Sequence, residues 1–253
     1  MYGAVIGDLA GSIYEYGQLK KIEPIKMEKV IHDNAFFSDD TILTVAISEA
    51  ALNGGDYASY LKKYIKEYEN YHPNFSPYFK SPFSPNTMKW AKSFNVGMSS
   101  GNGAMMRISA IGYLFDTEEE VIREAALATI PTHNSKEAKQ AATIIALMIF
   151  YFRKGLSKNE VYDLLNLSAV YTPFTRFNTT CRETLSNVLY AIFYSTSFED
   201  ALRLTLLMGG DTDTNACIVA SVCEALYGIS DNLVKEAEAK IPEKFTRILR
   251  KVK

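Results

Sequence analysis

The chain has 253 residues, with 27 Lys and Arg against 29 Asp and Glu, so its net charge at neutral pH is −2. Hydrophobic residues make up 47% of the chain, an ordinary composition for a globular protein. This charge balance, without a block of basic residues, argues against a dedicated nucleic-acid or membrane-surface binder. A chain of this length can bury about three quarters of its unfolded surface. We therefore expect one domain with a single large core over residues 1–253.

The chain gives no sequence signal for membrane insertion or export. Its most apolar run, residues 141–152, is too short to span a bilayer. The N-terminal segment lacks a charged start and contains Asp8, which is not typical of a signal peptide. Three cysteines form no CxxC pair, so we expect no cysteine-based zinc site. These features predict a cytoplasmic protein, and the absence of a heptad seam favours a monomer.

Apolar residues recur at helical spacing along most of the chain, which predicts an all-α fold. Only residues 29–32 favour an extended segment. Residues 71–100 contain four prolines among aromatic and serine residues, so we expect a functional loop or lid there, or an irregular layer packed on the core. The predicted helices span residues 41–52, 56–70, 104–114, 118–129, 135–152, 159–167, 182–194, 198–207, 213–227, 231–239 and 243–252.

Two acidic clusters precede predicted helices. The first, Ser38-Asp39-Asp40-Thr41, is explained in isolation by helix capping, because serine and acidic residues are common at helix starts. The second, Gly209-Gly210-Asp211-Thr212-Asp213-Thr214, places two carboxylates on one tight turn, where like charges repel. A hard divalent cation such as Mg²⁺ or Mn²⁺ takes carboxylate and hydroxyl ligands of this kind. If the clusters converge, their four aspartates suit a two-metal centre.

Weaker signals come from two glycine-containing segments. The segment Ser100-Gly101-Asn102-Gly103 precedes a predicted helix, so its backbone N–H groups can face a phosphate, although it is also typical of a plain turn. Gly3, Gly7 and Gly11 recur at a spacing of four, which predicts close helix packing. Glu15 follows them as either a surface acid or a general acid/base.

The chain contains three histidines, His32, His72 and His133, and none of them is paired at helical spacing. A zinc site built from them is therefore not expected. The His32-Asp33 pair lacks the upstream histidine that metal-dependent HD phosphohydrolases use. His133 precedes a predicted helix, where it is either a capping or core residue or part of a site.

In chain order the motifs are G-D-x-x-G-x-x-x-E, S-D-D-T, G-N-G-x-x-M-R, T-H and G-G-D-T-D-T-N-A. This order resembles the ADP-ribosylglycohydrolase family over residues 3 to about 242, and the Gly-Asp-Thr-Asp-Thr segment is its most specific element. The resemblance implies a compact all-α fold that binds two divalent cations, Mg²⁺ or Mn²⁺. It also implies hydrolysis of the glycosidic bond between ADP-ribose and a modified protein side chain or small molecule, with release of ADP-ribose.

Carried over by position, the resemblance implies that the metals are ligated by Ser38, Asp39, Asp40, Asp211, Asp213 and Thr214. It implies that Glu15 or the metal-ligating Asp39 assists proton transfer. The ribose and pyrophosphate are expected at the backbone amides of Gly101, Asn102 and Gly103, with His133 beside them. The adenine is expected to stack on an aromatic ring. The candidates are Phe83, Trp90, Phe94, Tyr171 and Phe174.

Two other functions use the same residues. A two-metal nucleotide phosphohydrolase would need the same carboxylates, but it would release phosphate or a mononucleotide. A catalytically inactive ADP-ribose-binding protein would share the fold, yet the presence of all four aspartates and Glu15 favours an active enzyme. The sequence leaves the acceptor open among arginine, serine, an O-acetyl ester, a nucleic-acid end and free guanidine.

Overall fold

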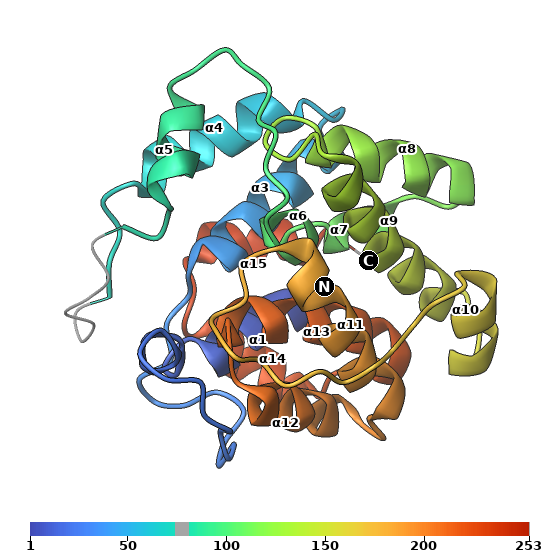
Figure 1. Ribbon diagram of the computed structural model, residues 1–253. Helices are drawn as coiled ribbons and strands as arrows, with labels where there is room; N and C mark the ends of the chain where they lie inside the picture. Colours follow the sequence, from blue (N-terminus) through green and yellow to red (C-terminus); the bar gives the residue numbers. More distant parts are fainter. Residues whose placement is uncertain (74–80, 253) are drawn as a thin grey trace.

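The computed structural model describes residues 1–73 and 81–252, and these residues form fifteen helices and no strand. The predicted all-α fold is therefore confirmed (Figure 1). The helices are α1 (Gly3–Gly11), α2 (Glu15–Gln18), α3 (Asp39–Leu52), α4 (Tyr57–Tyr68), α5 (Pro85–Ala91), α6 (Gly103–Met106), α7 (Ser109–Leu114), α8 (Glu118–Thr129), α9 (Lys136–Arg153), α10 (Lys158–Leu164), α11 (Cys181–Tyr194), α12 (Phe198–Met208), α13 (Thr212–Tyr227), α14 (Asp231–Glu238) and α15 (Glu243–Leu249).

Helix α13 forms the centre of the core, and α1 packs along it. Every residue of α1 is buried, as is every residue of α13 from Thr212 to Cys223. Ideal Cβ atoms placed on Gly3, Gly7 and Gly11 would lie 2.1–2.2 Å from carbonyl oxygens of α13. The absence of a side chain at these positions therefore lets the two backbones touch.

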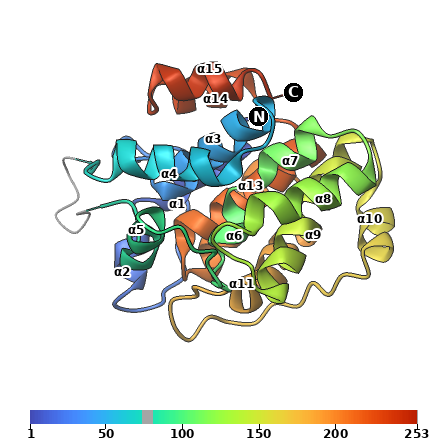
Figure 2. The same ribbon diagram turned by 90° about the horizontal axis from the view of Figure 1, so that it is seen from above.

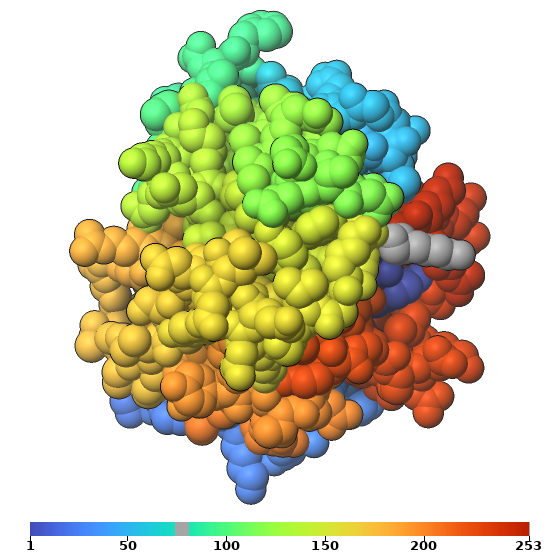
Figure 3. All heavy atoms as spheres, turned by 90° about the vertical axis from the view of Figure 1, so that its right-hand side faces the viewer, coloured from blue at the N-terminus to red at the C-terminus, as the bar shows by residue number. Residues whose placement is uncertain are grey.

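The other helices surround this pair in layers. Helices α14 and α15 lie in an outer layer (Figure 2), where α15 packs against α3 and α14 packs against α1. On another side, α9 packs against α7, α8 and α13. Helices α8, α9 and α10, coloured green to yellow, cover much of the face shown in Figure 3. Within the described residues, no helix is long and apolar enough to cross a bilayer.

Local sequence signals explain where many helices begin. Helices α8, α10 and α11 each begin with a capping box, in which a Thr or Ser and a Glu three residues later exchange side-chain and backbone hydrogen bonds. Serine side chains cap α5, α9, α12 and α14 in the same way without the reciprocal glutamate. These caps place most predicted helix starts within two residues of the observed ones.

One predicted helix is interrupted, and the helices predicted over 159–167 and 243–252 each end three residues early. The predicted helix over 104–114 is wrong as a single element, because it divides into α6 and α7 at Arg107 and Ile108. The Met106 carbonyl there accepts hydrogen bonds from Thr44 Oγ1 and Cys217 Sγ, each at 3.3 Å, on neighbouring helices. The predicted helix over 159–167 ends at Leu164, because Asn166 adopts the left-handed region with a φ of 46°.

The segments predicted to be extended (residues 29–32) and non-helical (residues 71–100) also differ from those predictions. Residues 29–32 are not a strand; the only β pairings in the described residues are isolated bridges, Met98 with His133 and Gly101 with Thr180. The predicted loop over 71–100 contains the seven-residue helix α5. Residues 74–80 of that loop lie outside the described residues.

Candidate active site

The N-termini of α3 and α13 meet, which brings the two acidic clusters together. The Thr214 hydroxyl on α13 and the Ser38 hydroxyl before α3 both donate to Asp40 Oδ2, each at 3.2 Å. All three side chains are buried. The hydroxyl groups predicted as metal ligands therefore converge on one carboxylate from opposite halves of the chain.

Carboxylates at this junction form two overlapping groups. One oxygen from each of Asp8, Asp40 and Asp213 lies within 4.8 Å of the others, and the same holds for Glu15, Asp211 and Asp213. Asp213 belongs to both groups, so two oxygen-rich positions lie side by side. This donor set suits hard divalent cations, which prefer oxygen ligands.

Asp8 was not among the predicted ligands, although the first motif contains it. It lies on α1, and its Oδ2 accepts hydrogen bonds from Ser38 N (2.9 Å), Thr41 N (3.1 Å) and Thr41 Oγ1 (2.5 Å). Its Oδ1 is buried without a hydrogen-bond partner within the described residues, as is Asp40 Oδ1. Buried polar atoms are normally paired, so these two oxygens are free to take a cation. The signal available in the sequence was an acid flanked by Gly7 and Gly11 in an otherwise apolar helix.

Asp211 occupies the N-cap position of α13 but does not cap it with its side chain. Its Oδ2 instead accepts a hydrogen bond of 2.7 Å from Asn102 Nδ2. A carboxylate at this position ordinarily satisfies backbone N–H groups. The Asp211 carboxylate therefore does not cap the helix and is instead oriented by Asn102.

Burial and mutual repulsion raise the pKa values of these acids. Burial, followed by the charge of Asp213, raises the pKa of Asp8 to about 7. Burial also raises the pKa of Asp211 to about 6, and burial with four neighbouring aspartates raises that of Glu15 to about 11. For Asp40 and Asp213 the pKa is raised well above the usual range, with burial as the largest cause. Cations would restore the charged forms of such a cluster.

Asp39 belongs to neither group of three among the described residues. Its side chain is half-buried, and burial and the charges of Asp213 and Asp8 raise its pKa, whereas the nearby Arg107 guanidinium lowers it. Asp39 therefore lies within the same electrostatic field at the edge of the cluster.

The loop predicted to hold ribose and pyrophosphate lies against the acidic cluster through Asn102. Two of its backbone amides are already used: Gly101 N donates to Ser99 Oγ (3.0 Å), and Asn102 N donates to Thr179 O (2.9 Å). This differs from the expectation that all three amides face a ligand. The His133 ring lies beside Gly101 and Gly103, with Nε2 at 3.4 and 3.5 Å from the positions of ideal Cβ atoms.

Two amide side chains that the sequence did not indicate hold the Gly209-Gly210 turn. Asn178 Oδ1 accepts from Asp211 N (2.8 Å), and Gln18 Oε1 accepts from Gly210 N (3.1 Å). Gly209 and Gly210 have φ values of 67° and 80°, which favour glycine. These bonds fix the turn from which both Asp211 and Asp213 project.

The five aromatic candidates for adenine stacking fall into different environments. Phe83 is buried in the core and is not available as a platform. Lys62 Nζ lies 5.4 Å from the ring centroid of Trp90 and 5.5 Å from that of Phe94, and Phe94 is fully exposed. Tyr171 is exposed and packs on Tyr190. Phe174 is half-buried beside the turn, with Cδ2 2.9 Å from an ideal Cβ on Gly210.

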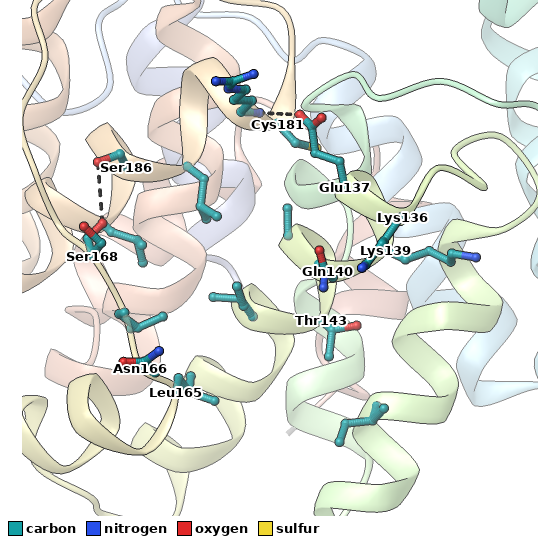
Figure 4. Close-up of a pocket in the computed structure, with 17 residues that line it drawn as sticks. Lys136, Glu137, Lys139, Gln140, Thr143, Leu165, Asn166, Ser168, Cys181 and Ser186 are labelled. Carbon is teal, nitrogen blue, oxygen red and sulfur yellow. Dashed lines mark hydrogen bonds between the residues drawn. The ribbon is translucent and has the colours of Figure 1, made fainter.

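A separate cavity of about 1100 Å³ lies between α9 and α11 (Figure 4). Apolar side chains, among them Ile144, Leu167 and Leu189, form much of its lining. Arg182 N donates to Glu137 Oε1 (2.8 Å) at its edge. None of the residues lining it is among the described carboxylates of the cluster, so this cavity is distinct from the acidic site.

These observations define a class of protein, all-helical with a buried cluster of carboxylates at the N-termini of two helices. The model of the ADP-ribosylglycohydrolase family matches residues 1–252. A putative ADP-ribosyl glycohydrolase, L543 of Acanthamoeba polyphaga mimivirus, is 25% identical over 281 aligned positions, which cover 89% of this chain and 84% of that protein. The uncharacterized protein YegU of Escherichia coli (strain K12) is 27% identical over 169 positions, 51% of each chain.

The fold is also found among solved structures. A chain described as an ADP-ribosylglycohydrolase-related protein complex superimposes with a TM-score of 0.71 at 19% identity, covering 97% of this chain and 89% of the other. With the family match over nearly the whole sequence, the chain belongs to the ADP-ribosylglycohydrolase family. The resemblance inferred from the motifs is confirmed, and membership supports hydrolase activity on ADP-ribose conjugates.

Proposed function

We propose that this protein is a metal-dependent hydrolase that cleaves the N- or O-glycosidic bond between ADP-ribose and a protein or small-molecule acceptor, releasing ADP-ribose. The observation that carries the proposal is the pair of carboxylate groups sharing Asp213 in a chain of this family. We further propose that residues 1–253 form one domain, because Met1 and Val252 belong to the same buried hydrophobic cluster.

The donor set fits two divalent cations. The proposed ligands come from the start of α3 and the start of α13, with two unpaired buried oxygens, Asp8 Oδ1 and Asp40 Oδ1, in the same cluster. Mg²⁺ and Mn²⁺ both accept such oxygen ligands. When bound, a divalent cation supplies Lewis-acid chemistry and lowers the pKa of a coordinated water toward neutrality. The proposed ligands are Ser38, Asp39, Asp40, Asp211, Asp213 and Thr214, and we add Asp8 to the proposal because its carboxylate lies in the same group as those of Asp40 and Asp213.

The remaining residues orient the substrate and handle protons. Asn102 holds the Asp211 carboxylate, so the loop that contacts the ligand also fixes one edge of the metal site. Gly101 and Gly103 present backbone without side chains, which permits close approach of a ribose or phosphate group. Glu15 is half-buried at the start of α2 beside Asp211 and Asp213, where it can take up or release a proton during glycosidic cleavage. Asp39 is the second candidate for that role.

Adenine binding is proposed at one of the accessible rings. Phe174 is favoured by its position against Gly210, next to the turn that carries Asp211. A ring face accepts adenine by stacking and needs few hydrogen bonds.

Product analysis tests the proposal. Metal-loaded protein is incubated with peptides ADP-ribosylated on arginine or serine and with O-acetyl-ADP-ribose, and the products are identified by mass spectrometry with an EDTA-treated control. Release of intact ADP-ribose that EDTA abolishes is expected, and the productive acceptor identifies the linkage. A mononucleotide product would instead favour the phosphohydrolase, and ADP-ribose binding without turnover on any acceptor would favour a binding protein.

A matched pair of variants controls for nonspecific effects. Asp213→Asn removes one charge from the carboxylate shared by both groups, so we expect loss of bound metal and of turnover. Asp163→Asn makes the same change at an exposed position on α10 and is expected to behave as the unaltered protein. Retention of metal and activity by Asp213→Asn would overturn the metal assignment.

A further inference from the structure

A buried polar chain connects Arg107 to His133, and the metal ligation proposed above does not use it. Arg107 is only 2% exposed, although its guanidinium is charged. Its Nη2 donates to Thr132 Oγ1, and that oxygen lies 2.6 Å from His133 Nδ1. Thr132 is also buried. This series of hydrogen bonds ends at the His133 imidazole ring, which lies beside the loop of residues 101–103.

The chemistry of the arginine fixes the direction of these hydrogen bonds. A guanidinium can only donate, so Thr132 Oγ1 accepts from Arg107 and keeps its own hydrogen for donation. That hydrogen has His133 Nδ1 as its acceptor at 2.6 Å. The reverse direction would leave a buried hydroxyl hydrogen without an acceptor, which is unfavourable. Nδ1 is therefore the unprotonated nitrogen, and the ring proton resides on Nε2.

Protonation of both ring nitrogens is opposed by the surroundings. Burial and the positive charge of Arg107 lower the pKa of His133 to about 3. The imidazole is thus neutral, and a neutral ring with an acceptor at Nδ1 presents one N–H group at Nε2.

The Nε2 atom is directed toward the ligand loop. It lies 3.4 and 3.5 Å from the positions that Cβ atoms on Gly101 and Gly103 would occupy. The backbone of His133 is fixed by its bridge to Met98 and by the bond from His133 N to Thr129 O (2.9 Å). No hydrogen bond from Nε2 to any acceptor is present in the part of the chain that the structure describes.

We propose that Arg107 and Thr132 are positioning residues that hold His133 as a neutral Nε2–H donor for an oxygen of the ligand bound over the Gly101–Gly103 loop. The identity of that ligand as an ADP-ribose conjugate rests on the proposed function, whereas the tautomer does not. His133 then contributes a hydrogen bond to binding and transfers no proton. Breaking the hydrogen bonds from Arg107 through Thr132 to His133 is expected to raise KM more than it lowers kcat.

Nitrogen-15 NMR of histidine-labelled, metal-loaded protein tests the tautomer directly. Three histidines give a simple spectrum, and His133→Gln assigns the signal of interest. A protonated Nε2 with an unprotonated Nδ1 is expected, unchanged over the neutral pH range. An Nδ1–H tautomer or an imidazolium ring at neutral pH would overturn the proposal. This result requires no substrate, so it remains decisive even if every ADP-ribosylated acceptor is left intact.

Two variants then test the role of the threonine. Thr132→Val keeps the shape but removes the hydroxyl, and Thr132→Ser keeps the hydroxyl. A lost neutral hydrogen bond weakens binding by about three- to tenfold, so we expect that increase in the Kd for free ADP-ribose with Thr132→Val, together with loss of the single tautomer. Thr132→Ser should restore both. Equal behaviour of the two variants would refute the positioning role of Thr132. If Thr132→Val does not fold, the His133 tautomer in the spectra of the unaltered protein and of Thr132→Ser tests the proposal.

Discussion

Substituting Gly7 by alanine should separate the two helices that carry the acidic cluster. A Cβ at this position would lie 2.1 Å from the Ala216 carbonyl oxygen and 2.6 Å from Cys217 N, both in the backbone of α13. Reaching even a close contact of 3.0 Å requires a displacement of at least 0.9 Å. Because the obstructing atoms are backbone, no side-chain rotation relieves the clash.

The displacement has two measurable effects. Overpacking in a well-packed core costs about 1–3 kcal/mol. We expect Gly7→Ala to lower the free energy of unfolding by an amount at or above the upper end of that range. Asp8 follows Gly7 on α1, whereas Asp213 lies on α13, so their carboxylates should also move apart and metal affinity should fall. Chemical denaturation measures the first effect, and calorimetric titration with Mn²⁺ measures the second.

Gly17→Ala is the matched control. A Cβ on Gly17 would meet nothing within 4 Å, and the residue lies on α2 near the same site. We expect this variant to bind metal normally and to be unchanged or slightly more stable, because alanine restricts the unfolded chain more than glycine does. If Gly7→Ala matched Gly17→Ala in stability and metal affinity, the backbone contact between α1 and α13 would not be what fixes the site.

Three further outcomes are expected. In metal-free protein, the pKa of Asp8 raised to about 7 and that of Asp211 raised to about 6 mean that folding favours the protonated forms of these two acids. Their contribution to stability is therefore fully present below about pH 4 and is lost as the pH rises through 6 to 7. Thermal unfolding against pH should show this loss with EDTA but not with saturating Mg²⁺ or Mn²⁺. Asn102→Ala frees the Asp211 carboxylate and is expected to weaken metal binding by about 10–100-fold, whereas an unchanged Kd would show that this bond does not orient the ligand. Glu15→Gln keeps a side-chain oxygen beside Asp211 and Asp213 but cannot exchange a proton, so it is expected to retain both metals while slowing hydrolysis in single-turnover assays; normal turnover would remove Glu15 from the proton-transfer role.

Much of the fold follows from local sequence signals. The capping residues Thr117, Ser157 and Thr180 lie where the apolar periodicity begins, so the starts of α8, α10 and α11 could be predicted. For the helix predicted over 104–114, tertiary contacts decided the outcome. The carbonyl of Met106 is bonded by residues of α3 and α13, and no pattern within residues 104–114 reveals those partners.

The candidate site was predictable to the extent that its residues form compact motifs. The Asp211-Thr212-Asp213 turn indicated a cation because its local charge density is unusual, and its convergence with Asp40 followed only from the resemblance. Asp8 and Asn178 were missed for a different reason. An acid in an otherwise apolar helix does not reveal which residues it meets, and an isolated Asn in a loop has no local signature. The roles of both residues arise from contacts made across 30 or more positions of the chain.

The packing of α1 against α13 also has a consequence for how the chain is made and folded. Helix α1 leaves the ribosome before its partner, which begins about 200 residues later, at Thr212. A nine-residue helix is too short to persist alone in water. Its apolar residues and Asp8 therefore lack their α13 partners until α13 has been synthesised. The proposed metal site can therefore assemble only after α1 and α13 have paired, and a cation that binds there would stabilise only chains in which that pairing has formed.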